Sequence, residues 1–511
     1  MSGGTSSTTL SLPSDNEAGE ASVRSEAHRR SCAGGPCGLE SAAITSKTQT
    51  YSPKGASPLS EPEPSSSGRL TLDQLEAAVT ERAVDTVVIG FPDTQGRLQG
   101  KRCAARFFLD EVALGGVGAC DYLLSVNVEM EPQEGFPSSW SSGFGDFHLR
   151  PDLDTLRLLA WRPGTALCIA DVVDERGVEV EVAPRTVLKR QLERLAAHGW
   201  TAAAATELEF IVHRDSYADA WTRNYHDLTP INRYNVDYSL FGQVEADPLI
   251  DDICRRMQAS GMYLETAKGE ANRGQHEINF KYADPLTTAD QHLIFKAGVK
   301  ELAFKHGVSA TFMAKWDERE GNSCHVHLSL TDRDDGHPVF AQSTEIFEQF
   351  LAGQLATLQE FTLLYAPNIN SYKRFAGHSF APTAVAWGED NRTVALRAIG
   401  AGPARRYENR LAGADVNPYL ALAANIAAGL HGVANQLTLP EPEKGDAYAA
   451  DHETVPPTLR DAREQFMRSA PALDAFGPRV VEHYGQAALV ELREFNAAVT
   501  DWERKRGYER L

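Results

Sequence analysis

The stretch Ser323-Cys-His-Val-His-Leu-Ser-Leu330 alternates polar and apolar side chains along its whole length. Successive side chains of a β-strand point to opposite faces, so His325, His327 and Ser329 share one face and the aliphatic residues between them share the other. The pattern therefore predicts a strand with one face in a hydrophobic core. Solvation alone also explains such alternation, and a lone His-x-His pair is more often exposed or packed in a core than a metal site.

Two further segments carry carboxylates in the same arrangement. Glu207 and Glu209 share one face of the apolar stretch 204–212. Glu277 follows Glu270 by seven residues, and the segment between them contains a predicted turn at residues 272–274. Carboxylates that share a face repel one another unless a cation lies between them.

Residues 405–410 form another such strand, in which Glu408 shares a face with Arg406 and Arg410. Hard divalent cations such as Mg²⁺ or Mn²⁺ prefer oxygen ligands and accept an imidazole among them. Taken together, the strands predict a site for two or more such ions, held by Glu207, Glu209, Glu270, Glu277, His325 and Glu408.

Arginines are concentrated between residues 374 and 410. Guanidinium groups bind phosphates and carboxylates in a bidentate manner, and divalent cations combined with arginines are typical of phosphoryl transfer. The alternative is a solvated surface. The sequence contains no G-x-x-x-x-G-K-[ST] loop and no G-x-G-x-x-G motif, which argues against a P-loop NTPase, a protein kinase or a Rossmann enzyme. The arginines concerned are Arg374, Arg392, Arg397, Arg406 and Arg410.

Length and composition set the limits of the interpretation. A chain of 511 residues with 42% hydrophobic residues favours two globular domains with additional segments. A net charge of −20 argues against a nucleic-acid partner. No segment approaches the about 20 apolar residues that span a bilayer, and no secretory signal is recognisable. The seven cysteines are scattered and odd in number, so we expect a reducing, cytoplasmic location and no disulfide framework.

The chain divides by composition. Residues 1–68 are rich in Ser, Gly, Pro and Glu, which predicts a disordered tail. Residues 70–172 combine a short helix with several strands and predict a small mixed domain. Residues 178–511 predict a large domain of irregularly alternating strands and long helices.

From Leu70 to the C-terminus, these segments resemble the glutamine synthetase family. The resemblance is carried by the E-x-E, G-Q-x-E, H-x-H-x-S, N-S-Y-K-R, N-R-x-x-x-x-R, R-x-E-x-R and N-P-Y-L motifs, which begin at Glu207, Gly274, His325, Asn370, Asn391, Arg406 and Asn417. It implies an α+β fold with a small β-grasp-like N-terminal domain and a large glutamine-synthetase-type catalytic domain, in which helices surround a curved antiparallel sheet. It also implies active sites between neighbouring subunits of a ring, and a homo-oligomer of two stacked hexamers.

The resemblance assigns roles to individual residues. One metal ion would be held by Glu209, Glu270 and Glu277, and the other by Glu207, His325 and Glu408. The residues facing ATP would be His327, Ser329, Arg392, Arg397 and Arg406. Glutamate would be bound by Gly321 and Arg374 at its α-carbon end and by Arg410 at its γ-carboxylate, and catalysis would depend on Arg374, Arg392 and Arg410.

The chain departs from ammonium-using members of this family in a flap that follows Arg374. Those members carry a glutamate in the pattern P-G-Y-E-A-P, and Phe380 stands at that position here. Their D-G-S-S segment is also absent, and its counterpart is the segment 133–140, which begins with Gln133. A buried ammonium ion needs carboxylates around it, so an apolar wall implies a larger amine that carries carbon. The group that deprotonates this amine stays open between Glu134, His378 and the γ-phosphate.

We therefore predict ATP-dependent ligation of the glutamate γ-carboxylate to an organic amine, such as ethanolamine, through γ-glutamyl phosphate. Three alternatives remain: an ammonium-using glutamine synthetase in which Phe380 merely packs the flap, a catalytically silent scaffold or nitrogen sensor, and a ligase for another acid. Tyr448 lies in a late loop where some family members carry an adenylylated tyrosine. Its surroundings lack the N-L-Y-D-L-P pattern, so we do not expect that regulation here.

Overall fold

The computed structural model describes residues 68–511, so the predicted disordered tail, residues 1–68, lies outside the described residues except for Gly68. The first sheet has the strand order β2-β1-β6-β4-β3, with β5 paired to β6. β1 pairs antiparallel with β2 and parallel with β6. The elements of this region are α1 (Leu72–Thr80), β1 (Thr86–Pro92), β2 (Leu98–Ala104), α2 (Ala105–Phe107), η1 (Phe108–Val112), α3 (Ala113–Gly115), β3 (Val117–Cys120), η2 (Asp121–Leu124), β4 (Asp146–Pro151), η3 (Leu153–Thr155), β5 (Arg157–Leu158) and β6 (Thr165–Val173).

The turn between β1 and β2 is held by the buried side chain of Asp93. The buried carboxylate of Asp93 accepts hydrogen bonds from the backbone N–H groups of Gln95 at 3.0 Å and Arg97 at 2.8 Å. Gly96 has φ +71°, and a Cβ atom there would lie 2.9 Å from the Cα of Asn417 in the second sheet's region. The turn therefore needs glycine both for its backbone conformation and for close packing.

The second sheet has the order β12-β13-β14-β11-β7-β9-β8, with β10 paired to β7. Its elements, with the helices around it, are α4 (Pro184–Ala197), β7 (Trp200–His213), α5 (Tyr217–Thr222), η4 (Phe241–Gln243), α6 (Asp247–Ala259), β8 (Leu264–Gly269), β9 (Gln275–Phe280), α7 (Pro285–Lys305), β10 (Ser309–Thr311), β11 (Cys324–Asp332), α8 (Val339–Gln342), α9 (Thr344–Tyr365), η5 (Ile369–Arg374), β12 (Trp387–Glu389), β13 (Leu396–Ile399), η6 (Gly402–Ala404), β14 (Arg406–Asn409), α10 (Pro418–Ala434), α11 (Leu459–Arg468), α12 (Ala470–Ala497) and α13 (Asp501–Gly507).

The predicted α+β class is confirmed, with one correction to the predicted antiparallel sheet. β12 and β13 at its edge run parallel, while the other neighbours in the sheet run antiparallel. The connection between β12 and β13 is hydrogen-bonded to a later segment, because the side chain of Asn391 donates to the carbonyls of Glu443 and Gly445. The side chain of Asn391 thus anchors the connection between the two parallel strands to residues 443–445.

One face of the second sheet is packed against helices. The apolar residues of β7 and β11, including Leu208, Phe210, Val326 and Leu328, belong to the same buried cluster as residues of α7, α9 and α10. α9 and α10 pack closely, since a Cβ atom at Gly353 would lie 2.1 Å from the Ala428 carbonyl oxygen. Helices on one face leave the opposite face of the sheet for the charged residues of these strands.

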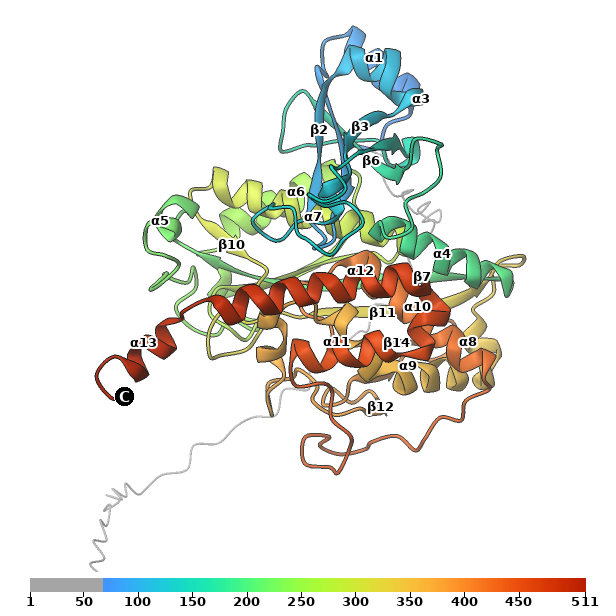
Figure 1. The fold of residues 1–511 in the computed structure, drawn as a ribbon, viewed down its shortest axis with the longest axis vertical. Coiled ribbons are helices and arrows are strands. Elements are labelled where there is room, and N and C mark those ends of the chain that lie inside the picture. Colours follow the sequence, from blue (N-terminus) through green and yellow to red (C-terminus); the bar gives the residue numbers. More distant parts are fainter. Residues whose placement is uncertain (1–67) are drawn as a thin grey trace, which may run out of the picture. The chain divides into compact units, whose positions relative to one another are not determined.

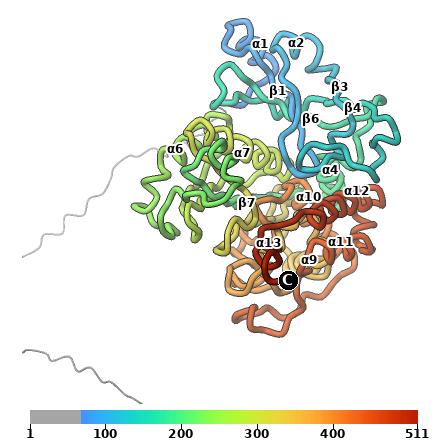
Figure 2. Tube along the Cα trace, turned by 60° about the vertical axis from the view of Figure 1, so that its left-hand side comes forward, coloured from blue at the N-terminus to red at the C-terminus, as the bar shows by residue number. Residues whose placement is uncertain are grey.

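The two sheets are joined by buried polar contacts. In the views of Figures 1 and 2 the blue elements of the first sheet gather apart from the green-to-red elements that follow. Arg185 of α4 contacts Asp171 of β6 and pairs with Asp290 of α7 at 3.1 Å, and the hydroxyl of Tyr419 donates to Asp290 at 2.6 Å. The predicted boundary, residues 172–178, begins at the end of β6 and lies before α4. It stays a prediction, because the described residues form one compact unit.

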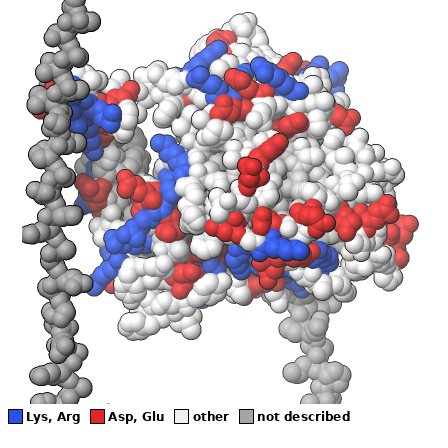
Figure 3. Space-filling model, turned by 90° about the horizontal axis from the view of Figure 1, so that it is seen from below, with Lys and Arg blue, Asp and Glu red and all other residues white. Residues whose placement is uncertain are grey.

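The surface carries both signs of charge. On the face shown in Figure 3, acidic and basic side chains are interspersed, and acidic side chains gather toward the right-hand edge. Within residues 68–511, no helix combines the length and the apolar composition needed to cross a membrane. The cysteines of the same residues are free, while Cys32 and Cys37 lie outside them.

Candidate active site

Strand register brings the predicted charged residues onto one face of the second sheet. Glu209 of β7 stands opposite Glu277 of β9. Glu207, two residues earlier on β7, stands opposite His325 of β11. His327 of β11 stands opposite Glu408 of β14, which completes a row across four strands. Residues far apart in the chain therefore meet because each strand carries its ionisable groups with a period of two.

A first carboxylate cluster is formed by Glu209, Glu270 and Glu277. One oxygen of each lies within 4.8 Å of the others. Burial, followed by the charge of Glu277, raises the pKa of Glu209 to about 7. Burial also raises the pKa of Glu277. Lys268, which is paired with Glu277 in the strand register, contacts the Glu270 carboxylate. Buried oxygens that repel one another are the donor set that a hard divalent cation stabilises, so these residues fit a metal ion.

A second cluster is formed by Glu207, His327 and Glu408, again with one ligand atom of each within 4.8 Å of the others. The resemblance assigned His325 rather than His327 to this cluster. His325 Nδ1 also lies close, 3.0 Å from Glu207 and 3.3 Å from Glu408. Within residues 68–511, its buried Nε2 has no hydrogen-bond partner. The geometry therefore leaves both histidines within reach of an ion held by the two carboxylates.

Protonation in the second cluster suits metal binding. Burial lowers the pKa of His325 to about 4, so its imidazole is neutral at pH 7. Burial acts to raise the pKa of Glu207, but hydrogen bonds from His325 and His327 outweigh it and leave that pKa well below its ordinary value. A neutral imidazole beside ionised carboxylates is the protonation state that a divalent ion requires of its ligands.

Two of the predicted arginines hold Glu408. Arg410 Nη1 donates to Glu408 at 2.5 Å and Arg397 Nη1 donates at 2.8 Å, while Glu408 itself is 0% exposed. Burial opposes ionisation of Glu408, but His325, which is protonated at the low pH where Glu408 titrates, and Arg410 lower the pKa of Glu408 to about 2. Arg392 is exposed in the turn between β12 and β13. The guanidinium cluster is therefore assembled around a carboxylate that also belongs to the second cluster.

Arg374, which the resemblance assigns to the α-carbon end of glutamate, is buried in this structure. The residue is 1% exposed, and its guanidinium donates to the backbone carbonyls of Leu411 at 2.8 Å and Arg410 at 2.9 Å. Burial lowers its pKa to about 10, which still leaves it charged at neutral pH. Gly321 packs directly on it, because a Cβ atom there would lie 2.9 Å from the Cγ of Arg374. In this structure Arg374 holds the backbone that carries Arg410.

Gln275 was missed by the sequence interpretation. Its side-chain amide donates to Glu209 at 2.8 Å and to the Gly321 carbonyl at 2.9 Å. It thereby connects the first cluster to the loop that contains Gly321. The signal was present, because Gln275 lies two residues before Glu277 on the same face of β9.

A cavity of about 610 Å³ borders the second cluster. Among the predicted residues it is lined by Glu207, His327, Ser329 and Arg406. Arg406 Nε lies 3.4 Å from His327 Nδ1. The volume suits a nucleotide-sized ligand. The sequence interpretation missed other lining residues, which include Thr266, Asn279, Phe280, Tyr282, Pro338 and Pro403.

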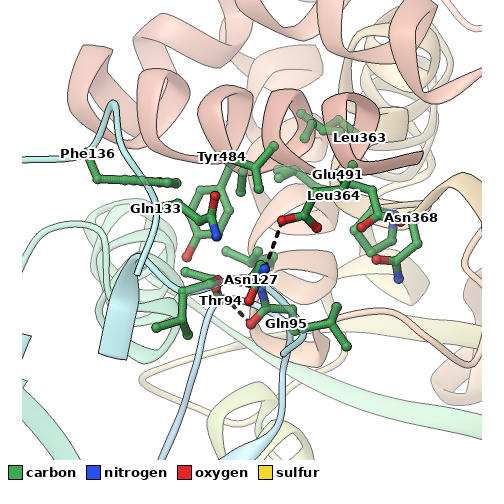
Figure 4. A pocket seen from close by; sticks show the side chains of 18 residues that line it. Thr94, Gln95, Asn127, Gln133, Phe136, Leu363, Leu364, Asn368, Tyr484 and Glu491 are labelled. Carbon is green, nitrogen blue, oxygen red and sulfur yellow. Dashed lines mark hydrogen bonds between the residues drawn. The ribbon is translucent and has the colours of Figure 1, made fainter. Parts of the chain in front are cut away.

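Phe380 lies beside Arg410 through its backbone. Its carbonyl oxygen accepts a hydrogen bond from Arg410 Nη2 at 3.4 Å, and its side chain is 60% exposed. Gln133 does not lie in the flap. It lines a cavity of about 60 Å³ together with Tyr484 and Glu491 (Figure 4). The neighbouring carbonyl of Glu134 accepts from the Gln486 side chain of α12. The flap therefore reaches the arginine cluster, and the segment of Gln133 packs on α12 of the same chain.

Comparison with known proteins adds independent findings. The family model described as "Glutamine synthetase, catalytic domain" matches residues 181–507. Gamma-glutamylethanolamide synthetase GlnA4 of Streptomyces coelicolor is 56% identical over 446 residues, which cover 86% of this chain and 96% of that protein. Glutamate--isopropylamine ligase of a Pseudomonas species is 38% identical over 437 residues, which cover 83% of this chain and 95% of that protein.

Solved structures agree with these sequence matches. The structure titled "GmaS/ADP complex-Conformation 1" has a TM-score of 0.74 to this chain and is 28% identical in sequence. The match covers 85% of this chain and 99% of that chain. A structure described as a novel glutamine synthase homolog has a TM-score of 0.70 at 24% identity, a likeness of fold alone.

Proposed function

The chain belongs to the glutamine synthetase family and is a carbon–nitrogen ligase, and on this premise we propose that it joins the γ-carboxylate of glutamate to ethanolamine, at the expense of ATP. The observation that carries the choice of an organic amine is Phe380. It occupies the flap position where ammonium-using members carry a glutamate, and its backbone is bonded to Arg410. A 56% identical relative that is named for γ-glutamylethanolamide synthesis supports ethanolamine.

The proposed reaction has two steps. An oxygen of the glutamate γ-carboxylate attacks the γ-phosphorus of ATP, which forms γ-glutamyl phosphate and releases ADP. The amine nitrogen then attacks the γ-carbonyl carbon, the bond to the phosphate oxygen breaks, and the amine loses one proton. Holding the activated acid and the amine together supplies the proximity that a bimolecular reaction lacks in water.

Individual residues of the chain fit the substrates of these two steps. Arg410, which is 2% exposed and already paired with Glu408, provides the positive charge beside the flap for a substrate carboxylate. Arg406 and His327 line the nucleotide cavity and would face the phosphates, with Ser329 further along β11. Arg397, bonded to Glu408, keeps that carboxylate in place.

Divalent cations, Mg²⁺ or Mn²⁺, would neutralise the charge that accumulates on the phosphoryl oxygens. We assign Glu209, Glu270 and Glu277 to one ion. We assign Glu207 and Glu408, with His325 or His327, to the other. We also propose a cytoplasmic enzyme that assembles as two stacked hexamers, as the family resemblance implies.

The test is phosphate release from ATP and glutamate with Mg²⁺ or Mn²⁺, in separate reactions with ethanolamine, isopropylamine, putrescine and ammonium. The amide product is identified by mass spectrometry. We expect the highest kcat/KM with ethanolamine and little turnover with ammonium. A preference for ammonium would contradict the role given to Phe380. An absence of turnover with every amine would favour a catalytically silent scaffold.

A further inference from the structure

The flap, residues 375–382, contains two residues in a strained backbone conformation. His378 has φ +58° and Phe380 has φ +57°, although neither is glycine. Such conformations persist where the surrounding structure holds them. Residues 376–378 and Phe380 are exposed, so packing beneath the flap does not hold these positions. Within the flap, the hydroxyl of Ser379 donates to the Ala376 carbonyl at 2.6 Å, and neighbouring segments supply further contacts.

The strap, residues 443–455, supplies such contacts. The hydroxyl of Tyr448 donates a hydrogen bond to the carbonyl oxygen of Ala381 at 2.9 Å. The imidazole of His378 lies 5.3 Å from the Tyr448 ring, measured between ring centres, and its Nε2 is 3.3 Å from Asp446. Arg410 holds the carbonyl of Phe380 from the other side. The flap is therefore tied both to the strap and to the arginine cluster.

The strap is itself anchored to the catalytic sheet. Asn391, in the turn before β13, donates to the Glu443 carbonyl at 3.1 Å and to the Gly445 carbonyl at 2.8 Å. The N–H of Ala447 donates to the hydroxyl of Thr393 at 3.0 Å. Ala447 is buried with Ala384, Ala386 and Val394 in a hydrophobic cluster separate from the two main ones.

The strap also pairs with the chain that leaves the flap. The N–H of Val385 donates to the Glu453 carbonyl at 2.8 Å, and the N–H of Val455 donates to the Thr383 carbonyl at 3.0 Å. Both ends of the strap are thus fixed, and Tyr448 lies between them. Its hydroxyl is half-buried, and burial raises its pKa, so it remains a hydrogen-bond donor at neutral pH.

We propose that Tyr448 is a positioning residue that keeps the flap closed beside Arg410 and so keeps water from the activated glutamyl group until the amine attacks. This inference rests on the proposed ligase reaction. When the flap opens, a water oxygen can attack the γ-carbonyl carbon of γ-glutamyl phosphate, the bond to phosphate breaks, and glutamate is regenerated. Opening therefore wastes ATP without forming amide. Tyr448 touches the flap backbone, so it acts through the flap and not on the substrate.

The test variant is Tyr448→Phe, which removes the hydroxyl and keeps the ring. Its matched control is Tyr217→Phe, because the hydroxyl of Tyr217 also donates to a backbone carbonyl, that of Ala310, at 2.9 Å and away from the flap. Losing one such hydrogen bond should raise the open population of the flap about two- to tenfold. Asp446→Asn, which weakens the contact with His378, should give a smaller change in the same direction.

Two measurements are made on each full-length variant. The first is the ratio of phosphate released to γ-glutamylethanolamide formed, which should rise in Tyr448→Phe while the KM for glutamate stays constant. The second is amide hydrogen exchange of residues 376–381 in the absence of turnover, which should accelerate about two- to tenfold. Tyr217→Phe should change neither quantity.

Unchanged exchange and an unchanged ratio in Tyr448→Phe would overturn the proposal. Faster exchange with an unchanged ratio would also overturn it, because the flap would then not control water. If the unaltered enzyme forms no amide with any amine, the proposed function fails, and the exchange result alone then decides whether Tyr448 holds the flap.

Discussion

Replacing Glu408 with glutamine should weaken both the fold and the second metal site, because this carboxylate is buried among positive groups. It accepts hydrogen bonds from Arg410 at 2.5 Å and Arg397 at 2.8 Å, and His325 Nδ1 lies 3.3 Å away. Glutamine keeps the volume and one oxygen acceptor. Its NH₂ group, however, must face one of the guanidinium donors, so at least one charge-assisted hydrogen bond is lost.

The size of the effect follows from these contacts. A hydrogen bond to a charged group contributes about 1.5–3 kcal/mol, so Glu408→Gln should lower the free energy of unfolding by about 2–3 kcal/mol. Glu408→Ala removes both bonds and leaves Arg410, 2% exposed, without its carboxylate. That variant should lose about 3–5 kcal/mol.

The assay is urea unfolding in the presence of EDTA, so that lost metal binding does not contribute to the result. The control is Glu389→Gln on β12. Glu389 is 53% exposed and pairs with Arg405, a type of contact that contributes about 0–1 kcal/mol. A Mn²⁺ titration of each variant then measures the second site, whose affinity should fall by about 100-fold or more in Glu408→Gln.

The reasoning would be refuted by a Glu408→Gln variant that unfolds at the same urea concentration as Glu389→Gln and binds Mn²⁺ like the unaltered protein. A variant that is destabilised but keeps its Mn²⁺ affinity would separate the two roles. It would leave Glu408 as an anchor for arginines and remove it from the metal site.

Three further predictions concern other parts of the protein. Burial and the charge of Glu277 raise the pKa of Glu209 to about 7, so a proton competes with the metal ion below that pH. The affinity for Mn²⁺, measured by calorimetry, should therefore increase roughly tenfold for each unit by which the pH is raised, and should become constant above about pH 7. Arg185→Ala leaves Asp290 buried without its cation and should cost about 3–5 kcal/mol in urea unfolding, whereas Arg176→Ala, whose side chain is 82% exposed, should change stability little. Arg406→Ala should raise the KM for ATP by about 10- to 100-fold and leave the KM for glutamate unchanged, because Arg406 lines the nucleotide cavity; equal changes in both constants would contradict that placement.

Much of the site was recognisable in the sequence because its strands are amphipathic. A period of two places Glu207 beside Glu209 and His325 beside His327 whatever the rest of the fold does. The helix α4 likewise begins at Pro184, a residue favoured at the first position of a helix. The same local rule could not separate His325 from His327, because both point to the same face.

Other features depended on contacts that no local pattern encodes. The resemblance assigns Arg374 to glutamate, and only the tertiary structure shows that it is buried and donates to the backbone carbonyls of Arg410 and Leu411. Gln275 looked like one residue of a motif, yet it joins Glu209 to the Gly321 loop. Tyr448 lacks the local pattern of a regulatory tyrosine, and its hydrogen bond to the flap depends on the tertiary placement of the strap.

The sequence by itself determined which side chains share a face, because side-chain alternation is a property of a few consecutive residues. It also places Phe380 in the flap, where the family resemblance implies a carboxylate in ammonium-using members. Only the tertiary structure decided which faces meet. The pairing of Glu209 with Glu277 and of Glu207 with His325 is set by strand register, and strand register is fixed by packing the apolar faces of distant segments against α7, α9 and α10.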